Sequence, residues 1–159
     1  MVVTTGLGRG EVWAYGEVRV MKLCDDTITV FNARVDPKDG GRVWTPTVIR
    51  GASWWELILS DVDAARGGLA AANRRVVRIP NDADTGGKRY VSPGMYARTA
   101  DVSELWTLAP GDLIVKGELA GDGWTPAALV SACDGCMTVL GVTDNCRARE
   151  APHLKAVGM

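Results

Sequence analysis

The cysteines and the single histidine are the side chains whose types and spacing come closest to a chemical site. Cys133-x-x-Cys136 is followed by Cys146 and His153, and four such ligands would satisfy tetrahedral zinc. One CxxC pair is weak evidence for zinc, because both cysteines can equally be small buried residues. Redox chemistry has less support still, because no βαβ pattern surrounds the pair. We keep zinc as a weak alternative, expect reduced thiols and predict no bound cofactor.

The polar segment Asn81–Lys88 contains fragments of three known motifs, each of them incomplete. Asp84-Thr85-Gly86 spells the core of the aspartic-protease motif, but it follows a polar stretch, and a homodimer would have to supply the second carboxylate. Asp82-x-Asp84-x-Gly86 resembles the start of a calcium loop without its third oxygen ligand or its distal glutamate. Gly87-Lys88 lacks the earlier glycine and the hydroxyl residue of a phosphate loop. The simplest interpretation is a polar turn, in which aspartates cap backbone amides and the glycines adopt positive φ.

Two adjacent tryptophans, Trp54 and Trp55, stand out among the six in the chain. Neighbouring residues of a strand point to opposite faces, so one indole can enter the core while the other is left for an interface, a groove or a sugar ring. Core and interface roles outweigh sugar binding, because aromatic side chains so often anchor protein contacts. His153 has no orienting partner nearby in the sequence, and we predict no catalytic residue.

The composition favours one folded domain without a strong electrostatic character. Of 159 residues, 47% are hydrophobic, and 18 Lys and Arg against 19 Asp and Glu leave a net charge of -1. The hydrophobic fraction suffices for a core. The net charge provides no basic field to hold a nucleic-acid duplex. The apolar stretches fall far short of the roughly 20 residues that span a bilayer, and the first ten residues lack an export signal. We expect a cytosolic protein with no membrane partner and no sequence-specific nucleic acid.

Alternation of apolar and polar residues predicts a mainly β protein. Residues 27–35 give the clearest alternation, with Ile28 and Val30 on one face. Ser92-Pro93 and Thr125-Pro126 each place a capping hydroxyl before a proline and predict two short helices, the first over residues 93–97. Other strands are expected at residues 42–50, 52–59, 74–79, 106–108, 113–119, 137–142 and 154–157, with a loop over 61–73 and a polar turn over 143–145.

These elements predict a small β-sandwich or partly closed barrel with one or two short helices. Residues 1–25 are expected to form a flexible, glycine-rich arm with a candidate added strand at Glu17–Val20, and residues 26–159 a single β-rich domain. Pro46 predicts a sheet edge or a bulge, because proline donates no hydrogen bond to a ladder.

Five stretches carry a further pattern: Ile28-Thr29-Val30-Phe31-Asn32-Ala33-Arg34, Pro46-Thr47-Val48-Ile49-Arg50-Gly51-Ala52-Ser53-Trp54, Ile79-Pro80-x-Asp82-Ala83-Asp84-x-Gly86-Gly87-Lys88-x-Tyr90-Val91-x-Pro93, Thr107-Leu108-x-Pro110-Gly111-Asp112-Leu113-Ile114-Val115-Lys116-Gly117 and Thr138-Val139-x-Gly141-Val142-Thr143-Asp144-Asn145. In this order and spacing they resemble a family of uncharacterised proteins that tailed phages and prophages encode in their structural modules. The resemblance implies a neighbourhood of capsid, head-completion and tail genes, hence a neck, minor capsid or tail component. In that family the residue at Thr85 is commonly bulky and cysteines are not regular features, which weakens the protease and zinc alternatives.

The expected function is therefore structural. We predict a virion protein, present in the host cytoplasm during assembly, that forms a homo-oligomeric ring at the head-to-tail connector or neck, near packaged DNA. Its partners would be other phage structural proteins on the portal or tail side. The alternatives are a tail-side terminator or tube-associated protein and, with less support, a zinc-stabilised or carboxylate-dependent enzyme. Besides the arm, the residues expected at assembly contacts are Trp54, Trp55, Asp82, Asp84, Gly86, Gly87 and Lys88.

Overall fold

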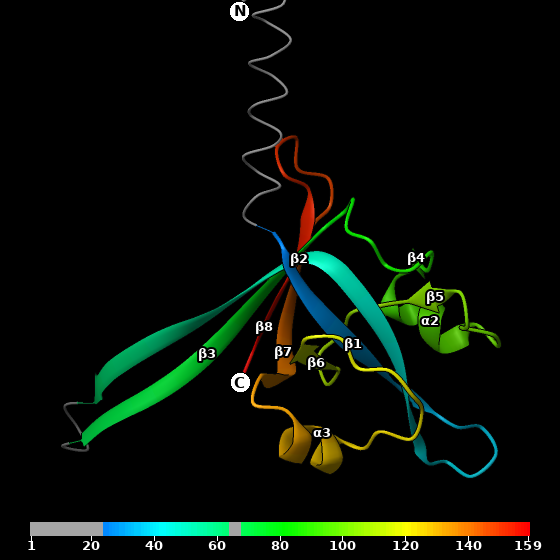
Figure 1. Ribbon diagram of the computed structural model, residues 1–159, viewed down its shortest axis with the longest axis horizontal. Coiled ribbons are helices and arrows are strands. Elements are labelled where there is room, and N and C mark those ends of the chain that lie inside the picture. Colours follow the sequence, from blue (N-terminus) through cyan, green and yellow to red (C-terminus); the bar gives the residue numbers. More distant parts are fainter. Residues whose placement is uncertain (1–23, 64–67) are drawn as a thin grey trace, which may run out of the picture.

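Six antiparallel strands form a closed barrel. The computed structural model describes residues 24–63 and 68–159, so the predicted arm up to residue 23, with the strand at Glu17–Val20, lies outside the described residues. The order around the barrel is β1-β2-β3-β8-β7-β6 (Figure 1). The strands are β1 (Asp26–Val35), β2 (Arg42–Asp63), β3 (Gly68–Pro80), β6 (Leu113–Lys116), β7 (Cys136–Asn145) and β8 (His153–Gly158). The prediction of a mainly β protein is confirmed, and the expected barrel is fully closed.

Two short helices and a small parallel sheet complete the described fold. They are α2 (Pro93–Arg98), α3 (Pro126–Ala132), β4 (Arg89–Tyr90) and β5 (Leu105–Trp106), with β4 and β5 paired beside α2 (Figure 1). Both helices begin at the predicted proline. The Thr125 hydroxyl accepts a hydrogen bond from the third amide of α3, whereas the Ser92 hydroxyl makes no such bond to α2.

The wall formed by β1 and β6 is covered by apolar side chains on both of its faces. Ile28 and Val30 are fully buried inside the barrel, on one face as the alternation predicted. Phe31 lies on the opposite face, in an outer cluster with Leu129 of α3. Because a strand covered on both faces has no exposed side, residues 28–32 of β1 form a continuous run of buried residues.

Strand β2 is a single strand of 22 residues, where the sequence predicted two strands separated at Gly51. Gly51 is the extra residue of a bulge, since Asp26 pairs with Ala52 while Thr27 pairs with Arg50. Its φ of +87° is accessible to glycine, which has no Cβ to clash. A bulge bends a strand without ending it, so the predicted break was wrong.

The predicted loop over residues 61–73 was also wrong. Strands β2 and β3 pair continuously from Ser53 with Arg78 to Asp63 with Gly68. Alanine and glycine have weak intrinsic preferences for strands, but pairing within the fold overrides such preferences. For the same reason β7 continues through the expected polar turn at 143–145, where each residue pairs with β8.

One buried carboxylate, that of Asp112, joins β1 to the turn before β6. Asp112 is 3% exposed and accepts hydrogen bonds from Asn32 Nδ2 at 2.9 Å, from Ala33 N at 3.0 Å and from Ala109 N at 2.9 Å. The amide of Asn32 also donates to Thr107 O at 2.7 Å. A carboxylate enclosed by these donors fixes the turn against the barrel wall.

Replacing Asp112 with asparagine tests this network. Asp112→Asn should lower the free energy of unfolding by about 1–3 kcal/mol at neutral pH, because an asparagine cannot accept all three hydrogen bonds.

Burial raises the pKa of the Asp112 carboxyl in the folded chain, so the folded chain binds this proton more tightly than the unfolded chain. The stability that Asp112 contributes through this shift is fully present below about pH 4 and is lost as pH rises through the raised pKa. Urea unfolding over this pH window should therefore show the native chain losing stability relative to the variant, and a constant difference would contradict the burial. The exposed Asp122→Asn is the control.

Gly158 of β8 lies where no side chain fits. A Cβ there would lie 2.1 Å from Thr138 O and 2.9 Å from Met137 Cε. Gly158→Ala should lower the free energy of unfolding by about 1–3 kcal/mol, because the backbone of β7 would have to move. Gly141→Ala in β7 is the matched control, since a Cβ there meets nothing within 4 Å. Equal losses for the two variants in urea titrations would count against this packing.

Candidate functional site

The Asn81–Lys88 loop covers the edge of β2 that β3 leaves open. Arg50 N donates to Asp84 O at 2.8 Å, and Asp84 N donates to Arg50 O at 3.0 Å. The ammonium group of Lys88 donates to Pro46 O at 2.9 Å, and burial lowers its pKa. Pro46 therefore lies at a sheet edge, as predicted. Lys88 is engaged within the chain and faces the barrel.

The Asp84 carboxylate makes the contacts expected of a polar turn. Its Oδ1 accepts a hydrogen bond from Gly86 N at 2.9 Å, and its Oδ2 lies 3.8 Å from Arg50 Nη1. Gly86 and Gly87 have φ of +66° and +86°, as the turn interpretation predicted. In an aspartic protease two neighbouring carboxylates share one proton, whereas the neighbour of the Asp84 carboxylate is a guanidinium. Asp82, Asp84 and the two glycines are exposed, and their role in assembly stays a prediction.

The four candidate zinc ligands lie at opposite ends of β7. Cys133 and Cys136 pack against the outer cluster with α3, whereas Cys146 packs against the barrel interior. Between Cys136 and Asn145 the strand has ten residues, which span about 30 Å. His153 Nε2 lies 3.3 Å from Asn145 Nδ2, at the end near Cys146. Within residues 24–63 and 68–159, no three His, Cys, Asp or Glu side chains are grouped to hold a metal ion. The four residues therefore do not form one zinc site.

Two of the thiols, those of Cys136 and Cys146, are also poorly placed for nucleophilic or redox chemistry. Burial raises the pKa of Cys136, and burial together with the neighbouring Asp144 raises the pKa of Cys146 to about 11. Since the thiolate is the reactive form, both groups are held in their unreactive state at neutral pH.

Removal of metal should leave the stability of the chain unchanged. Calorimetry with and without excess EDTA should give the same Tm, because ligands about 30 Å apart cannot share an ion. A Tm that falls with EDTA and recovers with zinc would contradict this arrangement. A protein with a known structural zinc site serves as the positive control for chelation.

The adjacent tryptophans point to opposite faces, as predicted. Trp54 is 9% exposed and belongs to the barrel core, and its amide donates to the Asp26 carboxylate at 2.9 Å. Trp55 is half-buried on the outer face, where the guanidinium carbon of Arg78 lies 5.2 Å from the ring centroid. This distance suits a cation–π contact. Trp55 is therefore the outward-facing member of the pair.

A two-stranded ribbon, residues 56–63 of β2 and 68–74 of β3, projects from the barrel (Figure 1). These residues pair with each other, and β3 gains β8 as a second neighbour only from Arg75 onward. Within the described part of the chain, neither strand of the ribbon has another partner. Eight extended residues reach about 26 Å. The ribbon thus presents two strand edges with unpaired backbone groups, a feature that the loop prediction had hidden.

An apolar root patch lies on the outer sheet face where the ribbon leaves the barrel. Cross-strand pairing places Trp55, Val76 and Val157 in one row, and residues paired in this way share a face. Leu57 lies two residues after Trp55 in β2, and Met159 lies two residues after Val157, just past the end of β8; they are 42% and 59% exposed. We define these five residues as the root patch. The sequence could not reveal it, because its members come from three strands.

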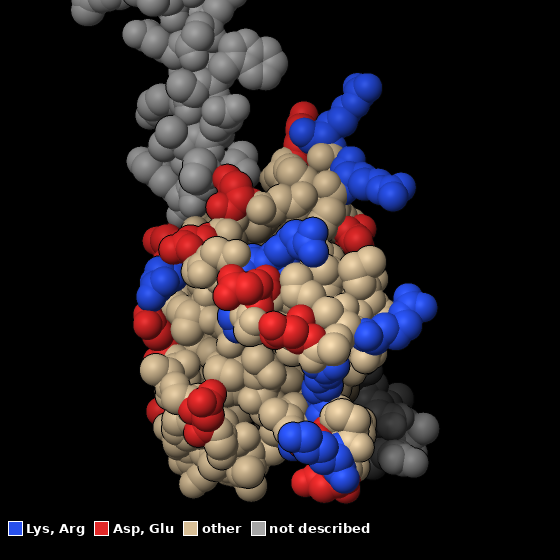
Figure 2. Space-filling view, turned by 90° about the vertical axis from the view of Figure 1, so that its right-hand side faces the viewer, with Lys and Arg blue, Asp and Glu red and all other residues tan. Residues whose placement is uncertain are grey.

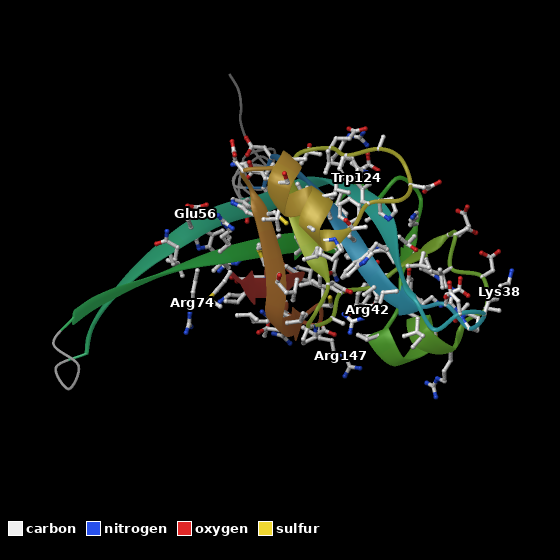
Figure 3. All side chains as sticks on the ribbon, turned by 90° about the horizontal axis from the view of Figure 1, so that it is seen from below. Lys38, Arg42, Glu56, Arg74, Trp124 and Arg147 are labelled. Carbon is white, nitrogen blue, oxygen red and sulfur yellow. The ribbon has the colours of Figure 1, made fainter. Side chains whose placement is uncertain are left out.

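The two strands of the ribbon differ in the sign of their charges. Residues 56–63 of β2 contain Glu56, Asp61 and Asp63 and no Lys or Arg. Residues 68–75 of β3 contain Arg74 and Arg75 and no Asp or Glu. Glu56 and Arg75 form an ion pair at 3.1 Å. Figure 3 shows Glu56 and Arg74 at the root of the ribbon, on opposite sides of it. On the side of the barrel near α2, by contrast, acidic and basic side chains are interspersed with uncharged ones (Figure 2).

Comparison with known proteins gives one match. Residues 23–159 match the model of DUF6751, a family of unknown function. No curated protein and no solved structure matches the chain significantly. The matched range contains the described residues of the barrel and of the ribbon. No helix among the described residues is both long and apolar enough to cross a bilayer.

Proposed function

We propose a structural role for this chain, which belongs to the DUF6751 family. It acts as a subunit of a tailed-phage particle, a head-to-tail connector or neck component that assembles with copies of itself and with portal-side or tail-side proteins. Assembly takes place in the host cytoplasm, and the finished subunit resides in the virion. The phage setting rests on the sequence resemblance described above.

The observation that carries the proposal is the ribbon with its two open edges. A two-stranded hairpin is marginally stable by itself in water, and open strand edges readily pair with another chain. The same fold covers its other exposed edge, at Pro46 and Arg50 of β2, with the Asn81–Lys88 loop. The ribbon edges are left open beside the exposed apolar residues of the root patch, a combination that suits contact with a neighbouring subunit.

An enzymatic role has less support from the described geometry. The Asp84 carboxylate faces Arg50, and the Asp112 carboxylate is enclosed by hydrogen-bond donors with 3% of the residue exposed. Neither group is placed to exchange a proton with a bound substrate. An assembly subunit needs neither a cofactor nor a reactive side chain.

Deletion of the gene tests the function. Induction of the deleted prophage should give DNA-filled heads and separate tails in electron micrographs, because heads without a connector cannot join tails. A wild-type copy supplied in trans should restore joined particles, and mass spectrometry should detect the protein in them. Its absence from purified wild-type particles would rule the proposal out. Joined particles with tails of abnormal length would instead assign the chain to the tail side.

Shortening the ribbon tests the surface itself. When a two-residue turn replaces residues 58–73, it closes the pair of Leu57 with Arg74, and the pairing of β2 with β1 and of β3 with β8 is retained. The variant should therefore melt cooperatively but fail to complement the deletion. The matched control replaces Pro37–Gly41, in the turn between β1 and β2, with an equally short turn and should complement. Joined particles at the wild-type level with the shortened ribbon would contradict the role given to it.

A further inference from the structure

We propose that the two open edges of the ribbon pair with each other between successive copies of this chain. Strand β3 of one copy lies beside β2 of the next, so that a ring of copies forms a second β-barrel with two strands from each copy. This inference rests on the proposed function and names the partner of the same surface, a second copy of the chain.

Strand direction allows this pairing around a ring. Strands β2 and β3 of one ribbon run antiparallel. If the ring axis runs along the ribbons, rotation keeps every ribbon pointing the same way, so β3 of one copy and β2 of the next are also antiparallel. Each contact is heterologous, because it uses one β2 edge and one β3 edge, and such contacts close into rings. Closure leaves no edge of the ribbon unpaired.

The lengths of the two edges match. On β2 the stretch without a second strand neighbour begins after Ala52, and on β3 it covers residues 68–74. Within the ribbon, residues 68–74 lie directly across from residues 57–63, so the two edges offer seven residues each at the same levels along the ribbon. A ladder between copies therefore pairs these two stretches over their full length without a shift along the strands. A ribbon edge shorter than its partner would have left backbone groups unpaired inside the assembly.

Charge favours this arrangement over a two-fold dimer. Residues 56–63 contain three acidic residues and no basic one, and Arg74 is the charged residue of stretch 68–74. Pairing β3 with β2 of the next copy at the same level places Arg74 beside Leu57, next to Glu56, whereas pairing β2 with β2 brings two acidic strands together. The 3.1 Å ion pair of Glu56 and Arg75 already makes this kind of cross-strand contact within one ribbon.

Two variants of the full chain, each altered at one edge, test the pairing. Asn73→Glu with Arg74→Glu makes the root of the β3 edge acidic, and Glu56→Lys with Leu57→Lys makes the facing root of the β2 edge basic. Sedimentation of each variant alone should show association at least about a hundredfold weaker than that of the native chain, because like charges then face each other. The control for the first variant, Arg147→Glu with Ala148→Glu, lowers the net charge by the same amount at exposed residues of the loop before β8 and should associate like the native chain.

Mixing the two variants gives the decisive result. The native β2 edge of the first variant fits the native β3 edge of the second, and the acidic β3 edge of the first also fits the basic β2 edge of the second. The mixture should therefore recover association to the size of the native assembly, and this recovery also shows that both variants are folded. A native chain that stays monomeric up to its solubility limit, a variant that associates alone like the native chain, or a mixture that stays dispersed would each overturn the inference.

These outcomes are separate from those that test the proposed function. If the protein is absent from phage particles, the proposed function fails. If the protein is present in particles but both edge variants complement the gene deletion at the native level, the function stands and the pairing of ribbon edges fails.

Discussion

Every N–H and C=O group of an extended strand needs a partner, and β2 is too long for the barrel to supply them all. Up to Ala52 its neighbour is β1, and from Ser53 its neighbour is β3. At the first residue of β1, the Asp26 side chain accepts the hydrogen bond of the Trp54 amide in place of a backbone group. Beyond that point β2 continues with a partner on one side alone among the described residues. The ribbon and its open edges follow from this excess of strand over barrel.

The barrel gives the ribbon a rigid base. Its interior is filled by buried apolar side chains, and α3 adds a second apolar layer outside β1 and β6. The Asp112 carboxylate fixes the turn before β6 to β1, and the absence of a Cβ at Gly158 lets β8 approach β7 closely. Because β2 and β3 enter the ribbon directly from this packed wall, the direction of the ribbon is set by the barrel and not by a flexible joint.

The sequence predicted the parts of the fold that depend on local patterns. The alternation around Ile28 and Val30, the proline starts of both helices and the opposite faces of Trp54 and Trp55 depend on neighbouring residues alone. Gly51 was misinterpreted because a glycine that ends a strand and one that bulges it look alike until the partner strand is known. The ribbon was missed because its alanines and glycines favour strands weakly, and the root patch because residues distant in sequence meet only in the sheet. The cysteine and histidine spacing suggested zinc because sequence distance does not reveal that an extended strand separates the ligands.

Amide hydrogen exchange tests the central claim, that the open edges of the ribbon pair between copies. About half of the ribbon amides face an open edge in a single chain, because successive residues of a strand point their N–H groups to alternate sides. In the dispersed protein these amides should exchange rapidly, and in the assembled ring they should become protected, while amides shared by β1 and β6 remain equally protected in both states. Rapid exchange of the ribbon edges in the assembled particle would contradict the account.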